Sequence, residues 1–118
     1  MPDDGTNRGD VVWARDPFRE GSNPRPWVVV ASSSLPYSAE DSVAVALTTS
    51  SHHTNSLQLS ADAWAYGNPD RQSYALPWSL ATLKTDTDVV GHQGAVTEPF
   101  TNRLTARVCS LLGHPPEE

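Results

Sequence analysis

Cysteine and lysine are nearly absent from this sequence of 118 residues, and it has no long apolar run. A single thiol, that of Cys109, cannot form a disulfide within the chain or provide the pair of thiolates that a cysteine-based zinc site requires. No stretch approaches the ~18 apolar residues that cross a bilayer, and residues 1–8 lack the basic and apolar segments of a secretory signal. We therefore expect a cytoplasmic protein that makes no membrane contact.

The charged residues are mostly acidic, and the net charge is −6. Of the eight basic residues, only Lys84 is a lysine. This balance opposes the binding of a polyanion by long-range repulsion, but it is also typical of adaptation to high salt, where screening shortens that repulsion to a few ångströms. Half of the basic residues stand in the first 25 positions, and residues 42–61 contain no Asp, Glu, Lys or Arg. One region of the chain can therefore still favour a phosphate.

The hydrophobic content of 37% and the four tryptophans are sufficient for one packed core. We expect a flexible N-terminal tail over residues 1–8, one barrel domain over 9–113 and a C-terminal tail over 114–118. Apolar runs predict strands at residues 11–15, 27–31, 42–49, 56–59, 73–76 and 79–84, with a helical turn at 62–65. The run at 27–31 is apolar throughout, which predicts a strand covered on both faces.

A longer helix is predicted near the C-terminus, because apolar residues recur there at helical spacing. They are Phe100, Leu104, Val108 and Leu111. Thr97 is a suitable N-cap, Pro99 fits the first turn and Gly113 can end the helix. Several short strands and one terminal helix indicate a mainly β fold, either a small SH3-like barrel or a twisted antiparallel sheet.

Common catalytic signatures are missing from the sequence. It has no glycine-rich phosphate loop, no Ser/His/Asp motif and no paired carboxylates at helical spacing. Its histidines lack the fixed spacing of a metal site, and adjacent side chains of an extended segment point to opposite faces. The four are His52, His53, His92 and His114. We therefore expect no metal and no other cofactor.

Several short motifs occur in an order that composition does not explain. They are GDVVW at 9–13, Asp16-Pro17, Gly21, Arg25-Pro26, TTS at 48–50, QGAV at 93–96 and LLG at 111–113. In this order and spacing, the chain resembles the MazF/PemK/Kid toxins of bacterial and archaeal toxin–antitoxin pairs over almost its whole length. The resemblance implies the fold that these toxins share with CcdB, and the activity of a sequence-specific endoribonuclease that cuts single-stranded RNA, chiefly mRNA.

The resemblance assigns Arg25 and Thr48 to the scissile phosphate. In RNA cleavage of this type the ribose 2′-OH attacks and leaves a 2′,3′-cyclic phosphate, so the enzyme must hold the phosphate and stabilise the charge that develops on its oxygens. A guanidinium can donate two hydrogen bonds to phosphate oxygens, and a threonine hydroxyl can orient them. Taken singly, Arg25 is equally typical of an exposed loop, and Thr48 of an ordinary strand.

Further residues are predicted to contact RNA on both sides of this pair. They are Asp16, Phe18, Arg19 and Glu20 in the first loop, and Thr49, Ser50 and His52 after Thr48. Phe18 can stack on a base or pack inward. The general base remains open between Glu20, His52 and His53, since an imidazole exchanges protons near neutral pH.

The resemblance further implies a homodimer whose RNA groove lies across or beside the subunit interface. This groove also binds the tail of a cognate antitoxin, with DNA contact through the antitoxin complex. Trp78 is a candidate for the subunit interface, because a Pro-Trp step between two strands places an indole at a corner of the fold, although it can also pack inward. Residues 76–79 replace a polar segment of the family, and the first loop is shorter. The alternative function is a non-catalytic, degenerate binding module or a toxin that acts on a protein target.

Overall fold

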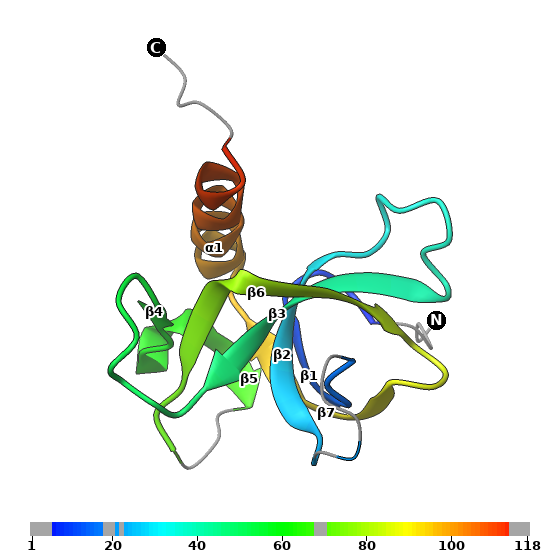
Figure 1. Ribbon diagram of the computed structural model, residues 1–118, viewed down its shortest axis with the longest axis horizontal. Coiled ribbons are helices and arrows are strands. Elements are labelled where there is room, and N and C mark those ends of the chain that lie inside the picture. Colours follow the sequence, from blue (N-terminus) through cyan, green and yellow to red (C-terminus); the bar gives the residue numbers. More distant parts are fainter. Residues whose placement is uncertain (1–5, 18–20, 22, 68–70, 114–118) are drawn as a thin grey trace.

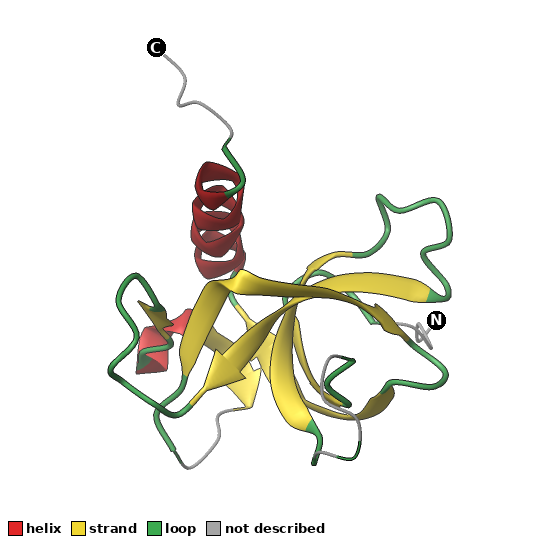
Figure 2. Cartoon of the chain, viewed as in Figure 1, coloured by secondary structure: helices red, strands yellow, loops and turns green. Residues whose placement is uncertain are grey.

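Seven antiparallel strands of the computed structural model form one curled sheet, and a single helix packs against it (Figures 1 and 2). The structure describes residues 6–17, 21, 23–67 and 71–113. In these residues the strand order across the sheet is β4-β6-β3-β2-β1-β7-β5. The elements are β1 (Asp10–Ala14), β2 (Arg25–Ala31), β3 (Asp41–Thr48), β4 (Leu57–Gln58), a 3-10 turn (Ala61–Ala63), β5 (Trp64–Gly67), β6 (Tyr74–Lys84), β7 (Val89–Val96) and α1 (Glu98–Leu111). The predicted mainly β fold with a C-terminal helix is confirmed.

Strand β2 lies at the centre of the sheet and is buried on both faces, as its apolar run predicts. Val28 and Val30 face a helix-side core that includes Phe100, Leu104 and Val108 of α1. Trp27 and Val29 face a second apolar cluster, here called the Trp27 core. Members of the Trp27 core are Val12, Ala14, Trp27, Val29, Ala44, Ala46, Ala81 and Leu83. Side chains alternate between these two cores along β2 because successive residues of a strand point to opposite faces.

Helix α1 begins and ends where the sequence predicts. The Thr97 hydroxyl accepts a hydrogen bond from the Phe100 amide at 3.3 Å, and Gly113 follows the helix with a φ of +97°. Leu111, however, does not share the buried face of α1, since it is 47% exposed. The reason is visible in Figure 1, where the C-terminal end of α1 projects beyond the sheet.

The strands predicted at residues 73–76 and 79–84 form one long strand, β6. Pairing with β3 shifts between Val45↔Leu80 and Leu47↔Ala75, so the Pro-Trp step at 77–78 lies in an irregular part of the ladder. Proline has no N–H to donate, and a bulge is a position in a strand that tolerates this loss. Trp78 is exposed there, so the possibility that it packs inward is wrong.

Strands β5 and β7 were not predicted, because neither has an apolar alternation of its own. β7 carries two glycines and polar residues, and becomes a strand through backbone pairing with β1 on one side and β5 on the other. The turn expected at 62–65 is a 3-10 turn at Ala61–Ala63, and the strand expected at 56–59 is the two-residue β4. Among the residues described, no helix is long and apolar enough to span a membrane.

Residues 6–8, expected in a flexible tail, pack against the barrel. Thr6 is buried; its hydroxyl forms a hydrogen bond with that of Ser42, and its carbonyl accepts one from the Ser32 hydroxyl at 2.6 Å. Arg8 donates to the Val30 carbonyl and to the Thr105 hydroxyl, both at 3.0 Å. The packed part of the chain therefore begins at least three residues before the predicted boundary, while residues 1–5 and 114–118 lie outside the described part.

Strands β5 and β7 approach each other closely at Gly67. Its φ is +78°, and a Cβ at this position would lie 2.4 Å from the Gln93 carbonyl oxygen. Any other residue would strain the backbone and displace β7. Gly91 in β7 offers a matched control, because a Cβ there would meet nothing within 4 Å.

We expect Gly67→Ala to lower the free energy of unfolding by about 1–3 kcal/mol, through left-handed strain and the clash with β7. Gly91→Ala should change it by about 0.5 kcal/mol or less. Chemical denaturation of both variants measures the difference. Equal stabilities would contradict the close approach of the two strands.

Candidate functional site

Arg25 and Thr48 meet at one end of two paired strands. β2 begins at Arg25 and β3 ends at Thr48. The antiparallel register includes Trp27↔Ala46, and two further steps along it place Arg25 opposite Thr48. The Arg25 side chain reaches the residue before Thr48, because Arg25 Nη2 donates to the Leu47 carbonyl at 2.8 Å. Both residues share the sheet face of the Trp27 core, opposite α1.

The Arg25 guanidinium is held by three neighbours. Besides the Leu47 carbonyl, Asp16 Oδ2 lies 3.6 Å from Nη1, and the Trp27 ring centroid lies 5.9 Å from Cζ. Arg25 is 28% exposed in its side chain and Asp16 only 7%. A guanidinium has five N–H donors, so these contacts fix its orientation and leave donors for a ligand in the solvent. The site can bind one anionic group, with Asp16 offsetting part of the charge.

Thr48 is half-buried, and its hydroxyl oxygen accepts a hydrogen bond from the Ser50 amide at 3.1 Å. Such a bond turns the chain directly after the strand. Because a hydroxyl has one proton and two lone pairs, the Thr48 O–H can donate to a second acceptor at the same time. Thr48 can therefore act on a phosphate oxygen without leaving its present conformation.

A line of side chains leads from Thr48 to β6. The Ser50 hydroxyl is hydrogen-bonded to His52 Nδ1, and the rings of His52 and His53 are stacked with centroids 4.4 Å apart. His53 in turn lies 6.1 Å from Trp78, between ring centroids and at 60°. From the sequence, Ser50 and His52 are predicted RNA contacts, whereas Trp78 is a candidate for the subunit interface within a segment that replaces part of the family's RNA groove. The sequence signal that marks this region is the stretch without charged residues around His52 and His53.

The other residues predicted to contact RNA are Thr49 and three residues that lie outside the described part of the chain. Phe18, Arg19 and Glu20 are not among the described residues, so their predicted roles stay predictions. Thr49 is exposed beside Thr48.

A pocket of about 250 Å³ lies at the N-terminal end of α1, and it was not predicted from the sequence. Its lining consists of Ser60, Asp62, Ala63, Thr97, Pro99, Phe100 and Arg103. A hydrogen bond from Ser60 holds the pKa of Asp62 below its ordinary value, and the charge of Arg103 acts in the same direction. The lining includes neither Arg25 nor Thr48, so this pocket is separate from the candidate site.

Metal-ligating side chains do not gather in the described part of the chain. Within it, no group of three or more His, Cys, Asp or Glu side chains could hold a metal ion. His92 Nε2 lies 3.8 Å from Asp10 Oδ2, and these two side chains are not part of a larger group of possible metal ligands among the described residues. The expectation of a site without metal stays a prediction.

Comparison with known proteins identifies the fold of this chain. No protein-family model matches the sequence, and no curated protein is significantly similar to it. An endoribonuclease from a mycobacterial species, solved in complex with its cognate antitoxin, has a TM-score of 0.68 and 23% identity over 96% of this chain and 100% of its own. A second mycobacterial endoribonuclease has a TM-score of 0.66 and 23% identity over 96% of both chains. These structures show that the chain has the fold of such proteins over nearly its whole length.

Proposed function

We propose that the chain is the toxin of a toxin–antitoxin pair, a cytoplasmic endoribonuclease that cuts single-stranded mRNA at specific sites without a metal ion. The observation that carries the proposal is that Arg25 and Thr48 lie at the same end of the paired strands β2 and β3, with the Arg25 guanidinium partly exposed to solvent. The likeness to two endoribonucleases over the whole chain supports it. Fold does not by itself determine function, so the proposal depends on the residues of the site.

In the proposed reaction the ribose 2′-oxygen attacks the adjacent phosphorus, and the bond from phosphorus to the 5′-oxygen breaks. The products are a 2′,3′-cyclic phosphate and a free 5′-OH. Arg25 donates hydrogen bonds to the non-bridging oxygens as their charge develops, and the Thr48 hydroxyl fixes their orientation. The guanidinium already has its orientation from the Leu47 carbonyl and Asp16, so little reorganisation accompanies the reaction.

The 2′-OH proton needs an acceptor and the 5′-oxygen needs a donor. Of the two candidate bases in the described part of the chain, His52 is the one that hydrogen bonds connect to Thr48, through Ser50. If Nδ1–H donates to the Ser50 hydroxyl, Nε2 is free to accept the 2′-OH proton. Arg25 can donate a hydrogen bond to the leaving 5′-oxygen as its charge develops, and solvent can supply the proton that completes the 5′-OH.

A cognate antitoxin is the proposed protein partner, as it is for one of the similar structures. An acidic or amphipathic tail of such a protein would compete with RNA for Arg25, since a carboxylate and a phosphate accept the same pair of guanidinium hydrogen bonds. The antitoxin would also supply any DNA contact, because the net charge of −6 on this chain opposes one.

A binding module without catalysis is the second candidate function. It is favoured by Asp16, whose carboxylate near Arg25 offsets the charge that a phosphate requires, and by the exposed apolar ring of Trp78 in place of a polar segment. Such a module would act on a protein target. Growth inhibition in cells would then survive the loss of Arg25 and of Thr48.

We expect the purified protein to cleave single-stranded RNA in EDTA, with activity tested at low and high salt. Arg25→Ala should lower the rate by at least about 100-fold, the usual cost of removing one preorganised donor to a developing oxyanion. Thr48→Val should also lose activity, whereas Thr48→Ser keeps the hydroxyl and should retain most of it. Gel electrophoresis of a labelled transcript measures all four proteins.

Two controls make the result specific. Arg15→Ala removes an exposed guanidinium at the end of β1 and should leave the rate unchanged. Thermal melting should show that Arg25→Ala still folds, because a hydrogen bond from a charged group contributes about 1.5–3 kcal/mol, less than the stability of a typical domain. Intact RNA with the wild-type protein in every buffer would overturn the ribonuclease function, and toxicity that survives both substitutions would favour the binding module.

A homodimer is proposed because the end of α1 leaves large apolar side chains uncovered. Leu111 is 47% exposed and Leu112 is 73% exposed, and both follow the part of α1 that packs on the sheet. A symmetric contact buries the same patch twice, and dimer interfaces typically remove about 1,200–2,000 Å² in total. Such a contact would leave each Arg25 site outside the interface, because Arg25 lies on the sheet face opposite α1.

Sedimentation at micromolar concentration should give the mass of two chains. The double substitution Leu111→Ser and Leu112→Ser should shift the protein toward the monomer, because it removes apolar area from the contact. Tyr37→Ser, at a side chain of similar exposure in the loop before β3, should leave the mass unchanged. A wild-type monomer at both low and high salt would rule out the dimer.

A further inference from the structure

We propose that Trp78, with the tilted ring of His53 beside it, forms a stacking platform for one nucleobase of the bound RNA. This inference rests on the proposed function, since it concerns the RNA whose phosphate Arg25 and Thr48 hold. It assigns Trp78 to RNA contact rather than to the subunit interface, and it extends the contacts predicted for the loop between β3 and β4 to β6.

The platform is continuous with the candidate phosphate site. Hydrogen bonds run from Thr48 to Ser50 and from Ser50 to His52, and ring contacts continue to His53 and Trp78. The Ser56 hydroxyl donates to the His53 carbonyl at 3.0 Å, which fixes the backbone beneath the ring. An RNA strand leaving the phosphate at Thr48 can therefore follow this loop.

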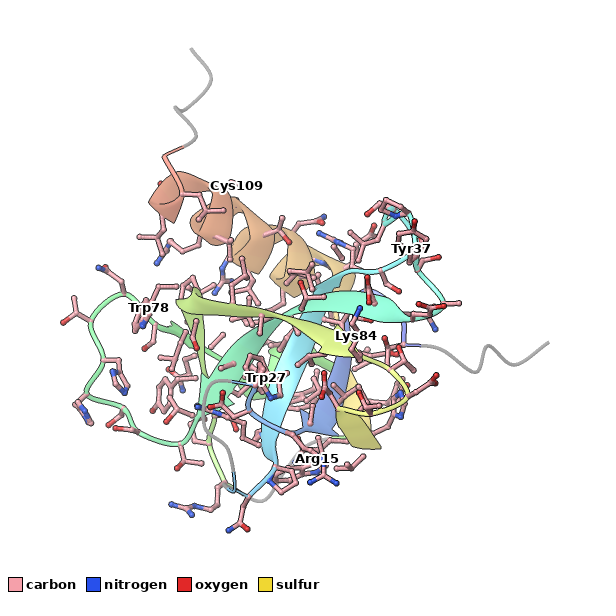
Figure 3. The ribbon with its side chains drawn as sticks, turned by 45° about the vertical axis from the view of Figure 1, so that its right-hand side comes forward. Arg15, Trp27, Tyr37, Trp78, Lys84 and Cys109 are labelled. Carbon is pink, nitrogen blue, oxygen red and sulfur yellow. The ribbon has the colours of Figure 1, made fainter. Side chains whose placement is uncertain are left out.

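Trp78 is held in an exposed position by its place in β6. It is 48% exposed, while the preceding Pro77 is fully buried and the two residues lie in the irregular part of the ladder. Figure 3 shows Trp78 on β6, on the opposite side of the molecule from Tyr37. A proline fixes its own φ, which restricts the backbone that presents the indole.

The chemistry of the platform suits a base of a single strand. Aromatic side chains stack on any nucleobase, because every base has a π-face. Residues 42–61, which carry His53, contain no acidic side chain, so this part of an acidic chain does not repel the phosphates by its own charge. The contact therefore adds affinity that the net charge of −6 does not provide.

A second copy of this chain is the other occupant that an exposed tryptophan could have. The subunit interface proposed above uses Leu111 and Leu112 at the end of α1, and neither is linked to Thr48 by a described contact. Trp78 is so linked, through His53. We therefore assign Trp78 to RNA rather than to the interface for which its sequence context made it a candidate.

The test is binding of a fluorescent single-stranded RNA of about twelve nucleotides and mixed sequence, 2′-O-methylated throughout so that it cannot be cleaved. Fluorescence anisotropy should show about 5- to 150-fold weaker binding for Trp78→Ala, the range for losing one stacked base. His53→Ala should weaken binding in the same direction, and Trp78→Phe should restore most of it. Tyr37→Ala, an aromatic residue of 69% exposure before the opposite end of β3, should bind like the wild type.

The outcomes separate the platform from the proposed function. If the wild type binds and cleaves RNA while Trp78→Ala and His53→Ala bind as tightly as Tyr37→Ala, the platform is wrong and the ribonuclease function stands. If Trp78→Ala sediments as a monomer where the wild type is a dimer, Trp78 belongs to the subunit interface and the platform is wrong. If the wild type neither binds nor cleaves RNA, the proposed function itself fails. His53→Ala and Trp78→Phe keep the test valid if Trp78→Ala does not fold.

Discussion

The pairing of β2 with β3 is the constraint on which the candidate site depends. β2 is apolar along its length and buried on both faces, so its place in the middle of the sheet follows from the cost of exposing those side chains. A shift of one residue would exchange the residues facing the two cores, which fixes the register. That register brings Arg25 to Thr48, and the Leu47 carbonyl and the Trp27 ring then orient the guanidinium. The chemistry at the end of the strands is thus a consequence of packing at their centre.

Because the chain has a net negative charge, the proposed binding of RNA must depend on contacts at short distance. A molecule with a net charge of −6 attracts no polyanion at long range, so affinity has to come from contacts at short distance. In the proposed function Arg25 provides one, although it shares its charge with Asp16. The proposed stacking of a base on Trp78 provides another that is independent of charge, in a part of the chain that is free of carboxylates. Acidic carboxylates gather elsewhere, as at Asp41, which accepts a hydrogen bond from Lys84 and raises the pKa of that amine.

Much of the fold could be predicted from local patterns, and the rest depended on contacts between distant segments. The apolar run of β2 and the helical spacing and N-cap of α1 carry their own signals, and both elements lie where predicted. β7 carries no such signal, since its glycines and polar residues become a strand only by pairing with β1 and β5. In the site, Arg25 and Thr48 could be chosen from a family resemblance, and the register shows how they meet. The contact of His53 with Trp78 could not be predicted, because it depends on an irregular stretch of β6 beside a loop from another part of the chain.

The claim at the centre of this account is that Arg25 and Thr48 hold a phosphate while the RNA supplies its own nucleophile. The chemical identity of the new RNA ends tests this claim most directly. Mass spectrometry of the fragments from a short RNA should find a 2′,3′-cyclic phosphate on the upstream fragment and a free 5′-OH on the downstream one, in the presence of EDTA. A 5′-phosphate with a free 3′-OH would show that water or a protein group attacks from the other side of the phosphorus, and would contradict the account.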